Sequence, residues 1–333
     1  VLVLGASRSG TSAAIALAGL GREVTLSDRR SPELLSGLEG ARSAGVRFAP
    51  EDTLAADWPR PDLVIKSPGV PGEAAPVEEA RQRGVPVWSE LELAYVLFAN
   101  PFDAITGTNG KTTTTALLGH LFTSAGRTSR VLGNIGVAVT SVAGDIAAEE
   151  ELVVEVSSFQ LEDIHTFRPA TGIFLNLTPD HLDRHGTMER YLACKANLFA
   201  NQRTGDVAVL NLADPAVAAL GVELAARPGG PRVDFFSTAG PDAAGTGSVQ
   251  PVSWIEAGWM FLGREPVLPV GDIKLPGLHN LENCLAAATA ALARGLDVEA
   301  VAAGLRTFTG VAHRLEKAGV VAGVTYVNDS KAT

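Results

Sequence analysis

The chain has 333 residues and a net charge of −10, from 37 acidic and 27 basic side chains. That length suffices for two or more domains, and a content of 46% hydrophobic and 19% charged residues is typical of a globular α/β protein. The acidic balance and the lack of any lysine and arginine cluster exclude a surface for nucleic acid. They leave open the binding of one small phosphorylated molecule.

Two cysteines, Cys194 and Cys284, are too few for a disulfide framework, and both fall in helical patterns. The chain has no run of eighteen apolar residues and no basic segment followed by an apolar leader. We therefore expect a cytoplasmic protein with no membrane partner. The first residues already read as a strand and the last ones fall inside a motif, so we expect both ends to be trimmed.

Residues 1–100 alternate short β-branched runs with helical patterns, which predicts a Rossmann-like domain with a parallel sheet. We expect strands at 1–4, 23–26, 62–65 and 85–87, and an alanine-rich helix at 12–20. A domain boundary is expected near Pro101.

A second and larger α/β pattern begins at Asp103. Its expected strands, at 104–105, 152–156, 172–177 and 207–211, are nearly continuous apolar runs, as in parallel sheets covered on both faces. Helices are expected at 111–124 and 281–295. Glycine and proline punctuation over residues 229–275 predicts a small antiparallel insertion, and residues 320–327 begin a further unit.

The strongest local signal is the segment Thr-Gly-Thr-Asn-Gly-Lys-Thr-Thr at 106–113, which follows a strand and opens a helix. Backbone N–H groups of such a loop cradle phosphates, Lys111 adds a positive charge, and the Thr112 hydroxyl is a ligand for Mg²⁺. The alternative is a glycine-rich helix cap. The common pattern has glycine five positions before Gly110, where this chain has Ile105, so the sequence predicts a shortened P-loop.

Two further strand ends carry polar side chains. Glu155, at the end of an apolar strand, is placed to hold a metal beside the phosphate loop, unless it is an edge-strand acid that faces water. His181 lies between two aspartates after the next strand, at the edge where parallel sheets bind ligands. It is a candidate metal ligand or carboxylate-orienting group, and a turn or cap residue is the alternative.

Lys195 lies on the apolar stripe of the helix that follows Thr187. An unpaired ammonium is too costly to bury, so this side chain must extend to water, pair with an acid or be chemically altered. The sequence does not decide between the first outcome and a functional role.

The segment Gly-Ala-Ser-Arg-Ser-Gly at 5–10 lies where a dinucleotide fingerprint would be, and Asp28 ends the second strand as a ribose-binding acid does. Ser7 replaces the glycine that lets the backbone approach a pyrophosphate, so we expect a nucleotide other than NAD. A scaffold with no ligand is the alternative.

Three polar segments lie toward the C-terminus, at 279–283, 313–314 and 328–333. Taken alone, Asn280 is explained as a helix cap, and Asp329 with Lys331 as an exposed turn.

Taken together and in this order, the polar segments resemble the Mur ligases of peptidoglycan precursor synthesis, over the whole chain. The resemblance is carried by Gly-Thr-Asn-Gly-Lys-Thr-Thr at 107–113, Gly-Asn-Ile-Gly at 133–136, Glu-Val-Ser-Ser-Phe-Gln at 155–160, Asn-Leu-Thr-Pro-Asp-His at 176–181, His-Asn at 279–280, His-Arg at 313–314 and Asn-Asp-Ser-Lys-Ala-Thr at 328–333. The Ser-Ser-Phe-Gln segment and the N-terminal domain resemble the branch of the family that adds D-glutamate.

The resemblance implies an α/β fold with three parts: a Rossmann-like UDP-binding domain at 1–100, a central P-loop ATPase domain at 101–312, and at 313–333 the start of a C-terminal amino-acid-binding domain that is largely missing. It implies a monomeric, ATP-dependent ligase that joins D-glutamate to UDP-N-acetylmuramoyl-L-alanine through an acyl phosphate. The alternatives are another Mur-type or a folylpolyglutamate-synthase-like amide ligase, and a non-catalytic nucleotide-binding module.

The resemblance also implies roles for individual residues. The catalytic residues would be Lys111, Glu155, His181 and Lys195. Two Mg²⁺ ions would be held by Thr112, Glu155, His181 and a carbamate on Lys195. ATP would contact Gly107, Thr108, Asn109, Gly110, Lys111, Thr112, Thr113, Asn283, Arg314, Asp329 and Lys331. The UDP-sugar would contact Ser7, Arg8, Ser9, Asp28, Arg29, Arg30, Gly69, Asn134, Ser157 and His181.

Overall fold

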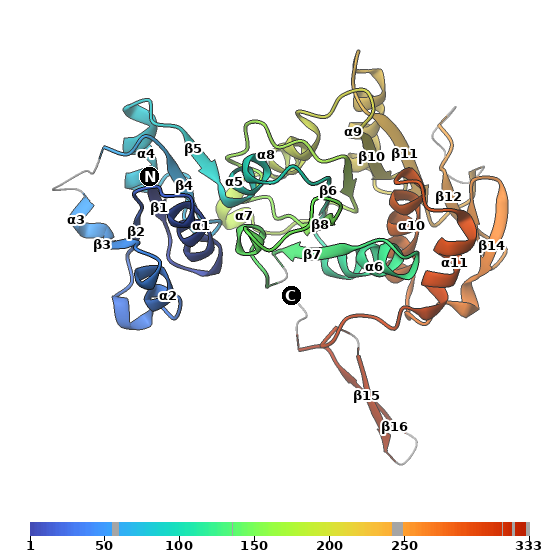
Figure 1. The fold of residues 1–333 in the computed structure, drawn as a ribbon. Helices are drawn as coiled ribbons and strands as arrows, with labels where there is room; N and C mark the ends of the chain where they lie inside the picture. The colour runs from blue at the N-terminus through green and yellow to red at the C-terminus, as the bar shows by residue number, and fades with distance from the viewer. Residues whose placement is uncertain (55–59, 135, 242–248, 315, 322–323, 331–333) are drawn as a thin grey trace.

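The computed structural model describes residues 1–54, 60–134, 136–241, 249–314, 316–321 and 324–330. The described chain forms a five-stranded sheet, a nine-stranded sheet and a two-stranded hairpin. The two larger sheets lie side by side along the molecule and helices surround both of them, whereas the hairpin projects away from them (Figure 1).

The first sheet is parallel throughout, in the order β3-β2-β1-β4-β5. Its strands are β1 (Leu2–Leu4), β2 (Thr25–Asp28), β3 (Arg47–Pro50), β4 (Val64–Lys66) and β5 (Val87–Ser89). The helices that follow them are α1 (Arg8–Gly19), the 3-10 turn η1 (Pro32–Leu34), α2 (Leu38–Ser43), α3 (Glu51–Leu54) and α4 (Ala75–Gln82). The strand order reverses at β1, as in the predicted Rossmann-like fold.

One boundary in this region was wrong by four residues. Helix α1 begins at Arg8 rather than at residue 12, because Gly10 tolerates the first turn. A Cβ atom on Gly10 would lie 1.9 Å from the carbonyl oxygen of Gly5, so only glycine allows the helix to start this close to β1. The predicted loop residues Arg8 and Ser9 therefore belong to the helix.

The second sheet has the order β14-β13-β12-β11-β10-β9-β6-β8-β7. Its strands are β6 (Phe102–Thr106), β7 (Ser129–Gly133), β8 (Glu151–Glu155), β9 (Thr171–Phe174), β10 (Val207–Asn211), β11 (Arg232–Ser237), β12 (Ser253–Glu256), β13 (Trp259–Leu262) and β14 (Glu265–Pro269). All pairs from β7 to β12 are parallel, and β12-β13-β14 is an antiparallel meander. This meander confirms the antiparallel structure predicted within residues 229–275, and it extends the central sheet because β12 pairs with β11.

Apolar side chains cover both faces of this sheet, as the continuous apolar strands predicted. On one face Ile105, Val153 and Ile173 pack with α6 (Lys111–Ser124), α10 (Leu278–Ala293) and α11 (Val298–Thr307). On the other, Ala104, Val154 and Phe174 pack with side chains of α5 (Glu90–Leu97) and α9 (Pro215–Ala226). The P-loop helix α6 matches its predicted range, whereas α10 starts three residues early.

Helix α5 joins the two sheets through buried carboxylates. Glu90 accepts hydrogen bonds from the N–H and hydroxyl groups of Thr140, in the 3-10 turn η2 (Val139–Val142). Glu92 accepts the backbone N–H groups of residues 165–167. Helix α5 lies before the predicted boundary near Pro101 yet is fixed to the central sheet, and the boundary itself stays a prediction.

The last described segment is an antiparallel hairpin of β15 (Glu316–Val321) and β16 (Val324–Asn328). It occupies the region expected to begin a further unit. Lys331 and Thr333 lie outside the described residues.

Candidate active site

The P-loop lies between β6 and α6, at the carboxyl edge of the central sheet. Gly107 and Gly110 have positive φ angles of 154° and 85°, which the loop needs in order to turn into the helix. Within α6 the first-turn N–H groups have no acceptor. The loop thus presents open N–H groups at the positive end of a 14-residue helix, which suits an anion.

Two asparagines shape this loop from outside. Asn176 Oδ1 accepts the N–H groups of Thr108 (3.1 Å) and Asn109 (2.8 Å). Asn283 is buried and accepts the Thr114 hydroxyl, and its Oδ1 is 2.1 Å from where a Cβ of Gly110 would be. Asn283 was a predicted ATP ligand, whereas Asn176 was quoted only as part of a motif. The structure places both against the phosphate loop.

Thr112 and Glu155 meet in front of α6. The Thr112 hydroxyl donates to Glu155 Oε2 at 2.8 Å, and Asn134 Nδ2 donates to Glu155 Oε1 at 2.9 Å. Glu155 is 2% exposed and ends β8, which has neighbours on both sides in the sheet, so it is not an edge-strand acid facing water. A hydroxyl and a carboxylate are oxygen donors of the kind that Mg²⁺ prefers.

Lys195 is buried on α8 (Met188–Ala196) and does not extend to water. Its Nζ donates to the carbonyl oxygen of Gly107 at 2.8 Å and lies 4.6 Å over the Tyr191 ring. Lys111 Nζ donates to the same carbonyl at 3.0 Å. Burial, followed by the positive charge of Lys111, lowers the pKa of Lys195 to about 7. Much of this side chain is therefore uncharged at neutral pH.

The phosphate loop carries positive charges that repel one another. Burial lowers the pKa of Lys111, and the nearby Arg314 guanidinium lowers it further, against the opposite effect of Glu155 and Asp180. Arg314 Nε is buried and has no hydrogen-bond partner among the described residues. A polyanion between these groups would relieve the repulsion and occupy the unpartnered donor. The residues present thus fit the triphosphate of a nucleotide with its Mg²⁺.

His181 precedes the short helix α7 (Leu182–His185) and has a φ angle of 52°, unusual for a residue with a side chain. Its imidazole is half-exposed, 3.5 Å from an Asp180 oxygen, and its ring centroid lies 5.1 Å from that of Phe159. The Tyr191 ring touches both His181 and Lys195, at 6.4 Å between centroids and 4.6 Å from Nζ. Tyr191 lies in the same helix as Lys195, α8, and connects two candidate metal ligands.

The C-terminal candidates are only partly placed. Arg314 is within electrostatic range of Lys111, as a nucleotide contact should be. Asp329 is exposed at the end of the hairpin, and Asn328 Nδ2 lies 2.8 Å from His313 Nδ1. Lys331 is outside the described residues. The roles of these residues stay predictions.

The candidate nucleotide loop of the first domain encloses a carboxylate. Asp28 is buried, and its oxygens accept the N–H groups of Ala6 (2.7 Å) and Arg30 (2.9 Å) and two guanidinium donors of Arg30. Burial raises the pKa of Asp28, but these hydrogen bonds and the Arg30 charge outweigh it and hold the value at about 2. Arg30 Nη2 also lies 3.1 Å from Ser7 Oγ. Asp28 is thus already paired before any ligand binds.

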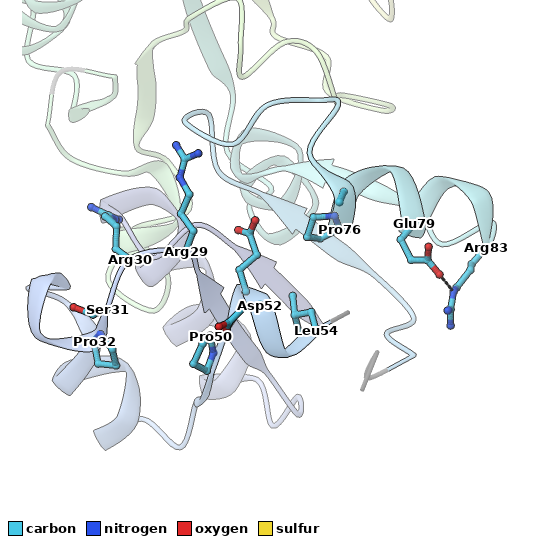
Figure 2. Close-up of a pocket in the computed structure, with 12 residues that line it drawn as sticks. Arg29, Arg30, Ser31, Pro32, Pro50, Asp52, Leu54, Pro76, Glu79 and Arg83 are labelled. Carbon is cyan, nitrogen blue, oxygen red and sulfur yellow. Dashed lines mark hydrogen bonds and ion pairs between the residues drawn. The ribbon is translucent and has the colours of Figure 1, made fainter. Parts of the chain in front are cut away.

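Two cavities flank this loop. One, of about 720 Å³, lies beyond the carboxyl ends of β2 and β3 (Figure 2). Arg29 and Arg30 line one side of it, and helix α4 lines the other, where Glu79 pairs with Arg83 just after the helix end. The other, of about 560 Å³, is lined by Ser7, Arg8 and Arg30 and by residues 136–138 near β7. Arg8 donates to the carbonyl oxygen of Gly136 at 2.9 Å, which joins α1 to the loop that follows β7. Arg30 lines both cavities.

The other predicted substrate contacts are spread between the sheets. Gly69 is exposed in the loop after β4, and Ser9 is half-buried in the first turn of α1. Ser157 donates to Gln160 Oε1 at 3.0 Å and follows Glu155 closely in the chain. The residues predicted to contact the UDP-sugar therefore lie on both sides of the junction between the two sheets.

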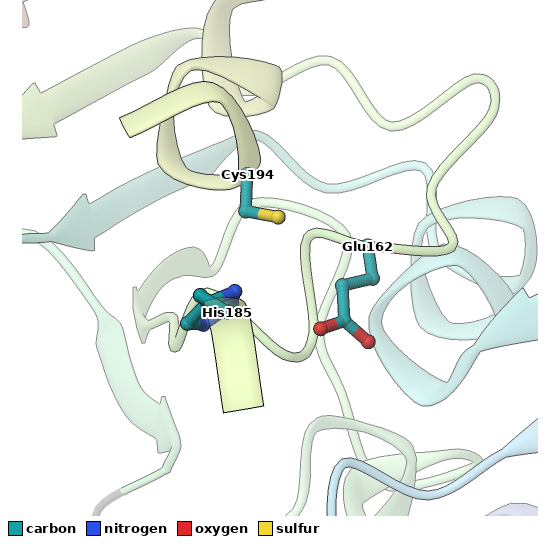
Figure 3. Close-up of side chains that lie close together, drawn as sticks. All are labelled: Glu162, His185 and Cys194. Atoms are coloured by element: carbon teal, nitrogen blue, oxygen red, sulfur yellow. The ribbon is translucent and has the colours of Figure 1, made fainter. Parts of the chain in front are cut away.

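One cluster at this junction was missed by the sequence patterns. Glu162, His185 and Cys194 have ligand atoms within 4.8 Å of one another (Figure 3). Glu162 is already paired with Lys66 (2.9 Å) and Arg184 (3.3 Å), and His185 Nε2 lies 2.9 Å from Ser158 Oγ. These existing partners make the cluster part of the packing rather than an open metal site. No sequence signal could have found it, because the three residues lie in separate segments that only the packed structure brings together.

Comparison with known proteins shows which family has this arrangement. A family model described as "Mur ligase middle domain" matches residues 105–291. A UDP-N-acetylmuramoylalanine–D-glutamate ligase from Pelotomaculum thermopropionicum is 45% identical over 338 residues, covering 100% of this chain and 72% of that protein. The enzyme of the same name from Shouchella clausii is 39% identical, with 100% and 71% covered.

Solved structures share the fold at lower identity. A UDP-N-acetylmuramate:L-alanyl-gamma-D-glutamyl-meso-diaminopimelate ligase from Neisseria meningitides has a TM-score of 0.61 and 18% identity, covering 93% of this chain and 98% of that one. The UDP-N-acetylmuramate-alanine ligase MurC from Thermotoga maritima has a TM-score of 0.56 and 22% identity, with 98% and 73% covered. No helix among the described residues is long and apolar enough to cross a membrane. With a matching family model over more than half its length and relatives at 38–45% identity, this chain belongs to the Mur ligase family.

Proposed function

We propose that this protein is an ATP-dependent ligase of peptidoglycan synthesis that joins D-glutamate to UDP-N-acetylmuramoyl-L-alanine through an acyl phosphate. The observation that carries the proposal is the meeting of Lys111 and Lys195 on the carbonyl oxygen of Gly107, beside the contact between Thr112 and Glu155. The names of the relatives at 38–45% identity support the substrate assignment.

The phosphate loop would hold the nucleotide in the first half-reaction. N–H groups at the start of α6 and the ammonium of Lys111 face the β and γ phosphates, and Asn176 and Asn283 fix the loop backbone. The γ-phosphoryl passes from ATP to the alanyl carboxylate of the substrate, which releases ADP and forms the acyl phosphate. The main barrier is repulsion between two anions, which the positive charges of the loop lower.

Thr112 and Glu155 are the residues that would hold the first Mg²⁺, which supplies charge neutralisation at the phosphates when bound. Asn134 keeps the carboxylate of Glu155 oriented from its other oxygen. A second ion, held by His181 and a modified Lys195, is part of the proposal.

The modification of Lys195 would be a carbamate. The uncharged amine attacks CO₂, an N–C bond forms and one proton leaves to solvent, so the product is an anion. A pKa of about 7 makes the uncharged amine abundant, and the exchange of a cation for an anion removes the repulsion between Lys195 and Lys111. In the second half-reaction the amine of D-glutamate attacks the acyl phosphate, and phosphate and an amide result.

The substrate nucleotide would bind at the first domain. Arg8, Arg29 and Arg30 provide guanidinium donors around the two cavities, and Ser7 and Ser9 stand at the start of α1. Gly69 and Asn134 would contact the sugar.

The test is phosphate release from ATP by the full-length protein, with UDP-N-acetylmuramoyl-L-alanine and Mg²⁺, across D-glutamate, L-alanine, L-lysine and meso-diaminopimelate. Release with D-glutamate alone is the expected result. Release with another amino acid, or only with a folate acceptor, would retain the ligase chemistry and overturn the substrate assignment. A protein that binds nucleotide and releases phosphate with none of them would favour the non-catalytic module.

A further inference from the structure

The turn that carries His181 is tied to the first domain by one side chain. Arg184 lies on α7, and its Nη1 and Nη2 donate to the carbonyl oxygens of Pro68 and Val70 at 3.1 and 3.0 Å. These carbonyls flank Gly69, in the loop for which the family resemblance implies a contact with the sugar. One guanidinium therefore joins the candidate sugar loop to the candidate metal ligand.

The orientation of Arg184 is fixed on its other sides. Its Nη2 lies 3.3 Å from Glu162 Oε2, and its guanidinium carbon lies 4.4 Å from the centroid of the Phe159 ring. The side chain is 17% exposed. The planar guanidinium group of Arg184 contacts two carbonyls, one carboxylate and an aromatic ring at the same time. A lysine ammonium is a single point charge and could not make all of these contacts.

Glu162 supports this arginine through an ion network built around the buried Lys66. Lys66, at the end of β4, has no exposed side-chain surface, and its Nζ lies 2.9 Å from Glu162 Oε2 and 3.0 Å from Asp163 Oδ2. Arg81 of α4 contacts Asp163 Oδ1 at 2.8 Å. Loss of one partner would leave a buried charge unpaired, so the network holds one arrangement.

The His181 turn is short and depends on side-chain contacts for its position, among them His185 with Ser158 and His181 with Tyr191. Helix α7 has four residues, too few to be stable by itself, and it begins at a residue with a φ angle of 52°. The imidazole of His181 contacts Asp180 and Phe159. Arg184 stacks on that same Phe159 ring, so a shift of its guanidinium would be transmitted to the imidazole.

We propose that Arg184 is a positioning residue that sets the placement of His181 relative to the bound UDP-sugar. The inference rests on the proposed function, because it assigns the arginine a task in aligning the substrate carboxylate with the γ-phosphate. Reacting atoms must approach to about 3–3.5 Å, and a misplacement of about 1 Å costs up to about 100-fold in rate. Arg184 touches neither reactant and acts through the loop and the turn.

The experiment compares Arg184→Lys with the wild type in the full-length protein, by steady-state phosphate release with UDP-N-acetylmuramoyl-L-alanine and D-glutamate. We expect kcat to fall about 10- to 100-fold, KM for the UDP-sugar to rise several-fold, and KM for ATP to change less than about two-fold. Arg232→Lys is the matched control, because Arg232 is an exposed arginine paired with Asp234 on the same strand, β11. It should keep the wild-type constants.

A second variant separates positioning from folding. Arg184→Ala leaves a gap of guanidinium shape, so added guanidinium ion at millimolar concentration should restore part of kcat in Arg184→Ala and not in Lys111→Ala. Wild-type constants in Arg184→Lys, or a loss of thermal stability alone with kcat retained, would overturn the inference. If the wild type itself releases no phosphate with D-glutamate, the proposed function fails and the inference falls with it.

Discussion

Two loops of this chain have the same local topology and different electrostatics. Residues 5–10 follow β1 and open α1, and residues 106–113 follow β6 and open α6. In the first loop the N–H of Ala6 donates to the carboxylate of Asp28, which Arg30 covers. In the second, Lys111 and Lys195 converge on the carbonyl of Gly107, and the first-turn N–H groups of α6 remain open.

The difference teaches what each loop can bind. An internal carboxylate occupies one N–H of the first loop and repels phosphates, so a ligand there depends on arginine forks at the rim of the two cavities. At the second loop, burial and the positive charges of Lys111 and Arg314 lower the pKa values of neighbouring lysines, and a bound anion would relieve this repulsion. A strand, a glycine loop and a helix are therefore insufficient to predict phosphoryl transfer, and the charges that face the loop decide.

The largest expected effect is that of Lys111→Ala, which removes the charge from the second loop. Phosphate release should fall by about 10²- to 10³-fold, because Lys111 faces the transferred phosphoryl group in the proposed mechanism. Binding of the UDP-sugar, measured by calorimetry, should not change, since that ligand depends on the first loop.

Lys274→Ala, a change at an exposed lysine that belongs to neither loop, is the control and should behave as the wild type. Equal losses of ATP and UDP-sugar binding in Lys111→Ala would show that the two loops are one site and would break the comparison.

Lys195 provides the second prediction, on pH and CO₂. Its pKa of about 7, against 10.5 for an ordinary lysine, leaves the amine protonated below pH 7 and uncharged above it. Only the uncharged amine reacts with CO₂, so phosphate release should rise with pH through about 7, fall in CO₂-depleted buffer and recover with bicarbonate. Lys195→Arg, which stays protonated, should lose about 100-fold at every pH.

Wild-type rates in Lys195→Arg would contradict the carbamate. Activity in the wild type that is insensitive to both pH and CO₂ would do so as well, and would leave Lys195 as a buried cation beside the phosphate loop.

The sequence predicted the phosphate loop better than its surroundings. The range of α6 and the position of Glu155 at a strand end follow from local patterns, namely apolar strands and a glycine loop that ends in lysine. The contacts of Asn176, Tyr191 and Arg184 do not, because each depends on which strands are neighbours and how far α7 and α8 reach across the junction. Lys195 was predicted in part. The apolar stripe of its helix placed it on the core-facing side, and only the packed structure shows that it meets Lys111 at the carbonyl oxygen of Gly107.

A third prediction compares one glycine in each loop. Gly110→Ala places a Cβ at a φ angle of 85° and 2.1 Å from Asn283 Oδ1, so it should cost about 1–3 kcal/mol of stability and weaken ATP binding. Gly10→Ala places a Cβ 1.9 Å from the carbonyl of Gly5 and should cost a similar free energy through backbone crowding. The second variant should weaken UDP-sugar binding and leave ATP binding unchanged.

Denaturant titration gives the stabilities, and calorimetry with each nucleotide gives the affinities. Gly19→Ala, with no heavy atom within 4 Å of the added Cβ, is the control in α1. Loss of ATP affinity in Gly10→Ala would mean that the two loops are coupled through the junction.

The predicted boundary near Pro101 shows why the contacts at the junction were not predictable. The pattern of strands and helices restarts there, yet Glu90 and Glu92 on α5 accept hydrogen bonds from residues 140 and 165–167. A buried carboxylate that accepts hydrogen bonds from a distant turn leaves no periodic pattern in the sequence, so such a contact cannot be predicted from it. The same holds for Lys66, whose partners follow it by about a hundred residues in the chain.

The smallest expected effect tests the carboxylate inside the first loop. Asp28 has a pKa of about 2 in the folded chain against 3.8 unfolded, so its ionised form stabilises the fold above pH 4, and this contribution is lost as pH falls toward 2. Arg30→Ala removes the largest pKa-lowering partner while burial remains. The free energy of unfolding should drop by about 1 kcal/mol at neutral pH, a modest value because Arg30 is half-exposed. The difference between variant and wild type should shrink as pH falls from 4 to 2 and vanish below pH 2, where Asp28 is protonated in both proteins. A constant difference from pH 7 to pH 2 would show that Arg30 acts by packing, and that the charge of Asp28 is not what distinguishes the first loop from the second.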